Sequence, residues 1–161
     1  MRITFLGGAD EVGASAVLVE AGGRRVLVDA GIRMSGLAGD KLPDLSAIDR
    51  AGGLDACLVT HAHTDHTGAL ALVVERHPAC PVYATAPTAA LTRVLQHDAQ
   101  RIMKDRLDRE DELPLFDLVA VEKLLAAFRP VRPRERVPLA PGLVATFSPF
   151  QRNVSPIRST K

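Results

Sequence analysis

The sequence predicts a single α/β (α+β) domain in which helices flank a mixed sheet, and three observations lead to this fold class. The chain has 161 residues and is 47% hydrophobic, which suits one core and is short for two ordinary domains. Runs rich in β-branched residues alternate with segments of helical periodicity. One buried run leads directly into a cluster of histidines, and mixed α/β sheets usually carry their sites at the carboxyl ends of strands.

The amino-terminal third predicts three strands. Residues 2–8 form an apolar run that stops at two glycines, where a turn is easily made. Residues 15–20 and 24–31 are two further apolar runs, and the intervening Ala-Gly-Gly indicates a β-hairpin. We therefore expect the second and third strands to pair in one sheet.

The rest of the chain predicts alternating helices and strands. In order, these are a helix over 45–52, a buried strand over 54–61, a helix over 67–78, a strand over 81–85, a helix over 87–106, a helix over 118–128 and a strand over 143–149. We interpret residues 129–142, which are rich in proline and arginine, as connecting chain. Residues 150–161 have no periodicity and no carboxylate, so we expect a disordered basic tail.

Composition narrows the functional classes. The formal net charge is +1, which gives no global electrostatic signature for nucleic acid or membrane. The apolar stretches are broken by charges and glycines well before membrane-spanning length, and residues 1–8 lack a signal peptide's apolar region. Cys57 and Cys80 have no metal-type spacing and are expected to be buried thiols. We expect a cytoplasmic protein with no membrane partner.

The stretch "VTHAHTDHTG" concentrates three of the five histidines and one aspartate after the strand predicted over 54–61. Imidazole and carboxylate are the ligands that zinc prefers when thiolates are absent. A tight loop after a rigid strand would bring these side chains together, whereas the alternative is a polar turn with accidental histidines. The spacing favours a metal site made of His61, His63, Asp65 and His66.

The pattern His-x-His-x-Asp-His after an apolar strand resembles the signature of the metallo-β-lactamase fold superfamily. This resemblance implies that residues 1–149 form the amino-terminal portion of an αββα sandwich. It implies that His61 and His63 bind one zinc ion and that Asp65 and His66 bind a second, with a hydroxide between the metals as the nucleophile. Asp65 and His66 are accordingly the expected catalytic residues, with Asp65 also orienting the attacking water.

Asp29, at the end of "VLVDAG", matches the superfamily's structural aspartate near the site. It is equally compatible with an ordinary turn residue at the end of a strand. The glycine-rich stretch "GGADEVGAS" lacks the endings of nucleotide-binding loops, so we interpret it as a tight turn near the metal cleft.

Two further stretches resemble the β-CASP nucleases, a branch of the same superfamily. These are "FLGGADEVGASAVLVEAGGRRVLVDAG" and "TGALALVVERHPACPVYATAPTAALTRVLQHDAQRIMK", in which Tyr83, Thr85, Thr88 and Asp98 match the branch's pattern. The resemblance implies a zinc-dependent ribonuclease that acts on RNA phosphodiesters. A thioester or lactone hydrolase of the same superfamily is the alternative enzyme. The loop that carries His61, His63, Asp65 and His66, the ligand loop, does not by itself determine whether carbon or phosphorus is attacked.

The family pattern breaks near the carboxyl terminus. The superfamily completes its site with later histidine and aspartate ligands, yet no histidine follows His97, and "FSP" runs into "FQRNVSPIRSTK" at Phe150. We interpret this as truncation, with a frameshift as the hypothesis for its origin. Two zinc ions in the intact family then become one or none here. The alternative to an enzyme is a non-catalytic remnant or metal-binding module, and a second copy or a missing carboxyl-terminal half is expected as a partner.

Basic and histidine residues outside the motif have less specific interpretations. The arginines of residues 129–136 are interpreted as part of a solvated linker, with phosphate binding as the alternative, because no aromatic residues are interleaved to stack bases. His77 and His97 are expected at the surface or at helix ends rather than as metal ligands.

Overall fold

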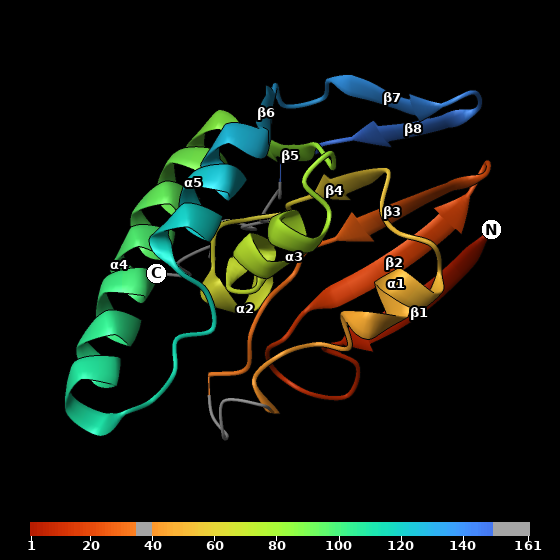
Figure 1. Ribbon diagram of the computed structural model, residues 1–161. Coiled ribbons are helices and arrows are strands. Elements are labelled where there is room, and N and C mark those ends of the chain that lie inside the picture. The colour runs from red at the N-terminus through yellow and green to blue at the C-terminus, as the bar shows by residue number, and fades with distance from the viewer. Residues whose placement is uncertain (35–39, 150–161) are drawn as a thin grey trace, which may run out of the picture.

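The structure, a computed structural model, describes residues 1–34 and 40–149, and it places six strands in one mixed sheet (Figure 1). The sheet order is β1-β2-β3-β4-β5-β6, and β7 pairs with β8 in a separate hairpin. The strand bounds are β1 Arg2–Gly7, β2 Ala16–Ala21, β3 Arg24–Val28, β4 Ala56–Leu58, β5 Val82–Thr85, β6 Phe128–Val131, β7 Arg136–Ala140 and β8 Leu143–Thr146. The predicted fold class, an α/β mixed sheet with flanking helices, is confirmed.

The sheet changes direction at β3. The strands β1, β2 and β3 are antiparallel, and the predicted hairpin between β2 and β3 is present with Gly22 and Gly23 at positive φ. The strands β3, β4, β5 and β6 are parallel, so their carboxyl ends lie along one edge of the sheet. Parallel strands need crossover connections, which the helices supply.

In the part of the chain that the structure describes, five helices cross over or flank the sheet, and one face of the sheet packs against them (Figure 1). Their bounds are α1 Ser46–Arg50, α2 Thr64–Thr67, α3 Leu70–Arg76, α4 Ala86–Glu110 and α5 Leu118–Ala127. The cross-strand row Leu18, Leu27, Cys57 and Val82 is fully buried and belongs to the same core as the apolar residues of α3 and α5. Burial of this face is the main source of stability, since apolar area removed from water is the dominant favourable contribution.

The opposite face of the sheet is apolar and partly open. Register places Phe5, Val17, Val28, Leu58 and Tyr83 in one row across five strands. Phe5 is 64% exposed, and the other four residues are only partly buried. This row is therefore less buried than the row that faces the helices, and Phe5 is its most exposed member.

The interpretation of residues 129–142 as connecting chain was wrong, because this segment contains β6 and β7. Pro130 lies in β6, the outermost strand of the six-stranded sheet, where a missing N–H on the solvent side is tolerated. Pro138 lies in β7, which has a neighbour on one side only. The prolines therefore mark edge strands here, whereas the sequence pattern alone favoured a loop.

The other predicted elements are present with shifted ends. The helix predicted over 67–78 is the shorter α3, and a separate short helix, α2, precedes it and begins inside the histidine motif. Helix α4 continues four residues beyond the predicted end to Glu110. The predicted tail, residues 150–161, lies outside the described residues.

Both cysteines are free and buried, as predicted. Burial raises the pKa of the Cys57 thiol well above its usual value, and burial together with the charge of Asp55 raises that of Cys80 to about 12. Both thiols are therefore protonated and unreactive at neutral pH. Within residues 1–34 and 40–149, no helix has the length and apolar character needed to cross a bilayer.

Candidate metal centre

The parallel pairing of β3 and β4 brings the predicted site residues together. Asp29 directly follows β3, and the segment from Thr60 to His66 begins two residues after β4 and runs into α2. Both segments thus leave the same edge of the sheet, although Asp29 and His66 are 37 residues apart in the sequence. The predicted gathering of Asp29 with the histidine motif is present.

The buried carboxylate of Asp29 forms hydrogen bonds with two residues of this segment, Thr60 and His66. Its Oδ1 accepts a hydrogen bond from the Thr60 backbone N–H at 2.8 Å, and its Oδ2 accepts from the Thr60 hydroxyl at 2.8 Å. The same Oδ2 lies 2.8 Å from His66 Nδ1. Asp29 has φ +61°, a left-handed conformation that aspartate and asparagine tolerate better than other non-glycine residues. Asp29 therefore organises the site, beyond being a strand-end turn residue.

These contacts fix which nitrogen of two imidazoles carries the proton. A carboxylate only accepts hydrogen bonds, so His66 Nδ1 is the donor to Asp29. Thr60 Oγ1 lies 3.0 Å from His61 Nδ1, and since the only hydroxyl proton is donated to Asp29, His61 Nδ1 must donate to the hydroxyl. In the neutral rings, the Nε2 atoms of His61 and His66 therefore carry the lone pairs, as metal ligation through Nε2 requires.

The four motif side chains form two close pairs of donor atoms. His61 Nε2 is 3.2 Å from His63 Nδ1, and His66 Nε2 is 3.6 Å from Asp65 Oδ2. Two ligand atoms that each lie about 2.0–2.2 Å from a tetrahedral zinc ion are separated by about 3.3–3.6 Å. The Asp65–His66 pair therefore has the spacing of one edge of a zinc coordination tetrahedron, and the His61–His63 pair is slightly closer than that.

The two pairs are neighbours. The ring centroids of His61 and His66 are 4.0 Å apart, and those of His61 and His63 are 4.7 Å apart. Partial burial, and then the nearby His66 and His63, lower the pKa of His61 below its usual value. The lowered pKa keeps the His61 ring neutral, and thus able to bind a cation, to a lower pH than an exposed histidine.

The donor set fits a metal only in part. Among the described residues, no group of three or more His, Cys, Asp or Glu side chains is arranged to hold a metal ion. A catalytic zinc typically needs about three protein ligands. Within residues 1–34 and 40–149, each of the two donor pairs offers two possible ligand atoms, fewer than this number.

Backbone hydrogen bonds fasten the motif to the loop after β3. The N–H groups of Ala30 and Ile32 donate to His66 O at 2.8 Å and Thr64 O at 3.2 Å, and the Ser15 N–H donates to Asp65 O at 2.9 Å. Gly31 lies so close to this segment that a Cβ there would meet Asp65 O at 1.6 Å. Only glycine permits this approach, which places the ligand loop against its support.

The glycine-rich stretch forms a turn beside the site, as predicted. Gly8, Gly13 and Ala14 have positive φ, and Ser15, at the end of the turn, holds the ligand loop through its backbone. Arg33 forms two side-chain hydrogen bonds of 2.6 Å with Glu11, which lower the pKa of that carboxyl and tie the turn to the loop after β3.

Sequence reasoning missed Thr60 and Gly31. Thr60 connects Asp29 to His61, and a hydroxyl residue directly before the first histidine is the only signal of this role in the sequence. Gly31 follows Asp29 by two residues, but its necessity depends on contact with Asp65, which sequence periodicity does not reveal.

Three residues that match the β-CASP pattern, Thr85, Thr88 and Asp98, lie at helix α4, outside the histidine motif. Thr85 is the N-cap of α4, where its side chain accepts from the Thr88 N–H and contacts the Thr88 hydroxyl at 2.9 Å. Asp98 lies on the exposed surface of α4 and pairs with Arg101 at 2.6 Å. His77 ends α3 beside Asp49, and His97 faces Glu122, as expected for residues without a metal role.

Comparison with known proteins places this geometry in a family. The model of the metallo-β-lactamase superfamily matches residues 9–146. A solved structure of MEM-A1, a subclass B3 metallo-β-lactamase isolated from a soil metagenome library, superposes with a TM-score of 0.53 at 22% identity. The alignment covers 86% of this chain and 46% of that one, and this likeness shows the fold.

Curated relatives come from all three domains of life. Ribonuclease TTHA0252 of Thermus thermophilus is 37% identical over 131 residues, which are 81% of this chain and 28% of that protein. Transcription termination factor FttA of Methanocaldococcus jannaschii is 41% identical over 110 residues, 65% of this chain and 16% of that protein. Cleavage and polyadenylation specificity factor subunit 3-II of Arabidopsis thaliana is 34% identical over 114 residues, 66% of this chain and 18% of that protein.

The chain therefore spans less than a third of the length of these relatives. They belong to the β-CASP branch that the sequence resemblance indicated, and the resemblance is confirmed for the amino-terminal part of that branch. With the family model matched over most of the chain and the sheet and ligand loop in place, the chain belongs to the metallo-β-lactamase superfamily.

Proposed function

We propose that this chain carries the amino-terminal part of a metal-dependent hydrolase that cleaves RNA phosphodiester bonds. The observation that carries this proposal is that the donor atoms of the motif form two close pairs. One imidazole of each pair, His61 or His66, is oriented by the buried carboxylate of Asp29. The choice of RNA is supported by similarity to a protein named as a ribonuclease, which shares 37% identity over 131 residues.

In this proposal, His61 and His63 hold one zinc ion, and Asp65 and His66 hold a second. When bound, zinc supplies a water of lowered pKa and positive charge beside the phosphate oxygens. Asp29 keeps the Nε2 lone pair of His66 directed outward by accepting the proton of Nδ1, and Thr60 does the same for His61. The Asp65 carboxylate, which is partly exposed, orients the attacking water.

The remaining ligands are proposed to come from polypeptide other than residues 1–34 and 40–149. The same polypeptide would cover the open face of the sheet, since the row containing Phe5 and Val17 is apolar and accessible. The buried free thiols of Cys57 and Cys80 fit a reducing compartment such as the cytoplasm.

A second candidate is a metal-binding module without catalytic activity. The absence of any three-residue ligand group among the described residues favours it, because two protein ligands leave an ion weakly held and poorly positioned.

Metal analysis and an RNA-cleavage assay on the purified 161-residue chain test both candidates. Close to two zinc ions together with cleavage of RNA, both lost in His61→Ala but retained in His97→Ala, a histidine outside the motif, would support the hydrolase for this chain by itself. Bound zinc without cleavage would instead support the metal-binding module. A chain that binds no zinc at saturating concentration would contradict both. Parallel assays with a thioester and a lactone test the alternative hydrolase chemistries.

A further inference from the structure

Residues 132–136, the arginine turn, lead from β6 into β7 and carry three exposed arginines: Arg132, Arg134 and Arg136. Two hydrogen bonds fix the shape of the turn. The Arg132 N–H donates to Glu135 Oε2 at 2.7 Å, and the Glu135 N–H donates to the Arg132 carbonyl at 3.0 Å. A third bond, from the Arg134 N–H to the Phe147 carbonyl at 2.7 Å, ties the turn to the segment after β8. The three arginines are therefore presented by a hydrogen-bonded turn and not by connecting chain.

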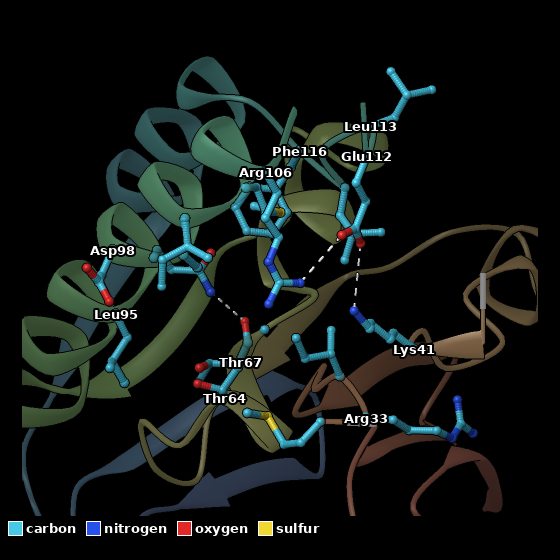
Figure 2. A pocket seen from close by; sticks show the side chains of 18 residues that line it. Arg33, Lys41, Thr64, Thr67, Leu95, Asp98, Arg106, Glu112, Leu113 and Phe116 are labelled. Carbon is cyan, nitrogen blue, oxygen red and sulfur yellow. Dashed lines mark hydrogen bonds and ion pairs between the residues drawn. The ribbon is translucent and has the colours of Figure 1, made fainter. Parts of the chain in front are cut away.

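The positive charge of the arginine turn is not neutralised within the described part of the chain. Most arginines elsewhere form ion pairs with Asp or Glu. At the rim of the apolar cavity that α4 helps to line, for example, Lys41 and Arg106 both approach Glu112, at 3.9 and 3.5 Å, as the dashed lines of Figure 2 show. Between residues 1–34 and 40–149, no such pair involves the three arginines of the turn. The carboxylate of the turn itself, Glu135, is bonded to the backbone.

Arg134 has a backbone conformation that arginine rarely adopts. Its φ is +66°, in the left-handed region where glycine, asparagine and aspartate are the usual residues. Unfavourable backbone conformations of this kind cluster at functional sites, because the surrounding structure holds them in place. An arginine at this position therefore indicates a role for its side chain that outweighs the conformational cost.

The arginine turn leaves the same edge of the sheet as the ligand loop (Figure 1). Strand β4 pairs with β5 at Leu58 and Tyr83, and β5 pairs with β6 at Thr85 and Val131. Arg132 therefore follows β6 at the level at which the ligand loop follows β4, two strands or about 10 Å away. The intervening strand, β5, leads into the amino terminus of the 25-residue helix α4, where the helix dipole places partial positive charge. The edge is thus positive from the arginine turn to the metal centre.

The chemistry of the arginine turn selects phosphate groups. Guanidinium groups bind phosphate through paired N–H donors, which gives arginine an advantage over other cations. Residues 132–136 include no aromatic side chain on which a base could stack, so contact is expected with the backbone of a nucleic acid and not with its bases. Arg129 is not part of this surface, because its Nη1 donates to the carbonyls of Ala126 and Phe128, both at 3.0 Å.

We propose that the arginine turn binds the phosphate backbone of single-stranded RNA and positions the strand along the edge of the sheet that carries the metal centre. The identification of the polyanion as RNA rests on the proposed function. The contact itself requires no metal, because the three guanidinium groups belong to the turn alone. It is also independent of base sequence.

Fluorescence anisotropy of a labelled single-stranded RNA, titrated with the metal-free 161-residue chain in the presence of a chelator, tests the arginine turn. The triple variant Arg132→Gln/Arg134→Gln/Arg136→Gln should bind at least about tenfold more weakly at low salt. The slope of log affinity against log salt concentration should become shallower by about 2, as the loss of three phosphate contacts on a single strand implies. No saturable binding by the wild-type chain would overturn the proposal.

A matched control removes the same net charge from another part of the surface. Arg2→Gln/Arg101→Gln/Arg109→Gln changes three arginines whose side chains are 72, 74 and 73% exposed and paired with carboxylates. This variant should bind RNA within about twofold of wild type, because its arginines do not contact the strand. Equal losses of affinity in the two triple variants would show that only the overall charge matters and would overturn the assignment. Displacement of RNA by polyglutamate at equal charge concentration would also overturn it, since an acidic protein would then fit the turn as well.

Arg134→Gly separates the arginine side chain from the fold. Glycine adopts positive φ readily, so the variant should not lower the Tm, yet it should weaken RNA binding roughly three- to fivefold through the loss of one phosphate contact. A lowered Tm with unchanged RNA affinity would mean that Arg134 has a structural role only. Because binding is measured without metal, a chain that binds RNA through the turn without cleaving it supports this proposal while contradicting the proposed hydrolase activity.

Discussion

At the scale of single residues, one buried carboxylate controls two imidazoles. Asp29 accepts from Thr60 and His66 directly, and it sets the tautomer of His61 through the Thr60 hydroxyl. Outer partners of this kind orient metal-binding histidines and raise their basicity. The site therefore depends on Asp29 although Asp29 is not one of the proposed ligands.

Replacing Asp29 with asparagine tests this dependence. An asparagine at this position would tolerate the same backbone conformation but would present an amide N–H₂ to at least one existing donor, which leaves a buried group unsatisfied. We expect a loss of about 1–3 kcal/mol in the free energy of unfolding and a roughly 10- to 100-fold loss of zinc affinity, measured by urea denaturation and chelator competition. Asp10→Asn is the matched control, since Asp10 is exposed and has φ +63°. Wild-type zinc affinity in Asp29→Asn would show that the carboxylate does not set the site.

Gly31 makes a second residue-level prediction. Its backbone is not in the left-handed region, so the cost of Gly31→Ala arises from the overlap of the new Cβ with Asp65 O. We expect destabilisation of at least about 2–3 kcal/mol, in the range of overpacked sites. In the control Gly23→Ala, where φ is +72° and open space surrounds the residue, only the conformational cost of about 1–2 kcal/mol applies. Thermal unfolding that ranks Gly23→Ala as the more damaging change would contradict the close approach.

At the scale of elements, the site depends on the junction between the antiparallel and parallel parts of the sheet. Asp55, directly before β4, accepts from Arg24 Nη1 and from the backbone N–H of Arg25, both at 2.8 Å. It thus holds the beginning of β4 against β3, the strand that leads to Asp29. Burial raises the pKa of Asp55, but the hydrogen bonds from Arg24 and Arg25 outweigh it, so the pKa lies below its ordinary value.

Asp55→Asn should therefore lower stability in a pH-dependent manner. A carboxyl whose pKa is lower in the folded state contributes stability that is present above its unfolded pKa of about 3.9 and is lost as pH falls through the folded value. We expect wild type to exceed Asp55→Asn by about 1 kcal/mol at pH 7 and the difference to vanish as the pH falls well below 4. Urea unfolding at a series of pH values measures this. A difference that is constant with pH would mean that the charge of Asp55 contributes nothing.

At the scale of the whole molecule, the sheet has one buried face and one partly open face. The helices cover the row containing Leu18 and Leu27, whereas Phe5 and Val17 on the other face remain accessible. An apolar surface of this kind favours association in water.

We accordingly expect the purified chain to self-associate through the open face. Phe5→Thr should raise the dissociation constant by roughly tenfold, because it removes a large apolar side chain from the contact. Val12→Thr, which changes a residue that is 93% exposed in the turn after β1, should leave association unchanged. Sedimentation equilibrium over a range of concentrations measures the constants. A chain that is monomeric throughout the range would contradict the prediction.

The sequence by itself determined the fold class, most elements, the four candidate ligands and the likeness to a superfamily, because periodicity and ligand spacing are local properties of the chain. It failed at residues 129–142, where Pro130 and Pro138 looked like loop residues, because only strand order reveals that β6 and β7 lie at edges. Tertiary structure alone decided the roles of Thr60 and Gly31 and the level at which Arg132 leaves the sheet. Each depends on contacts between segments about 30 residues or more apart in sequence, such as Asp29 with Thr60 and Thr85 with Val131, and no local pattern encodes such a distance.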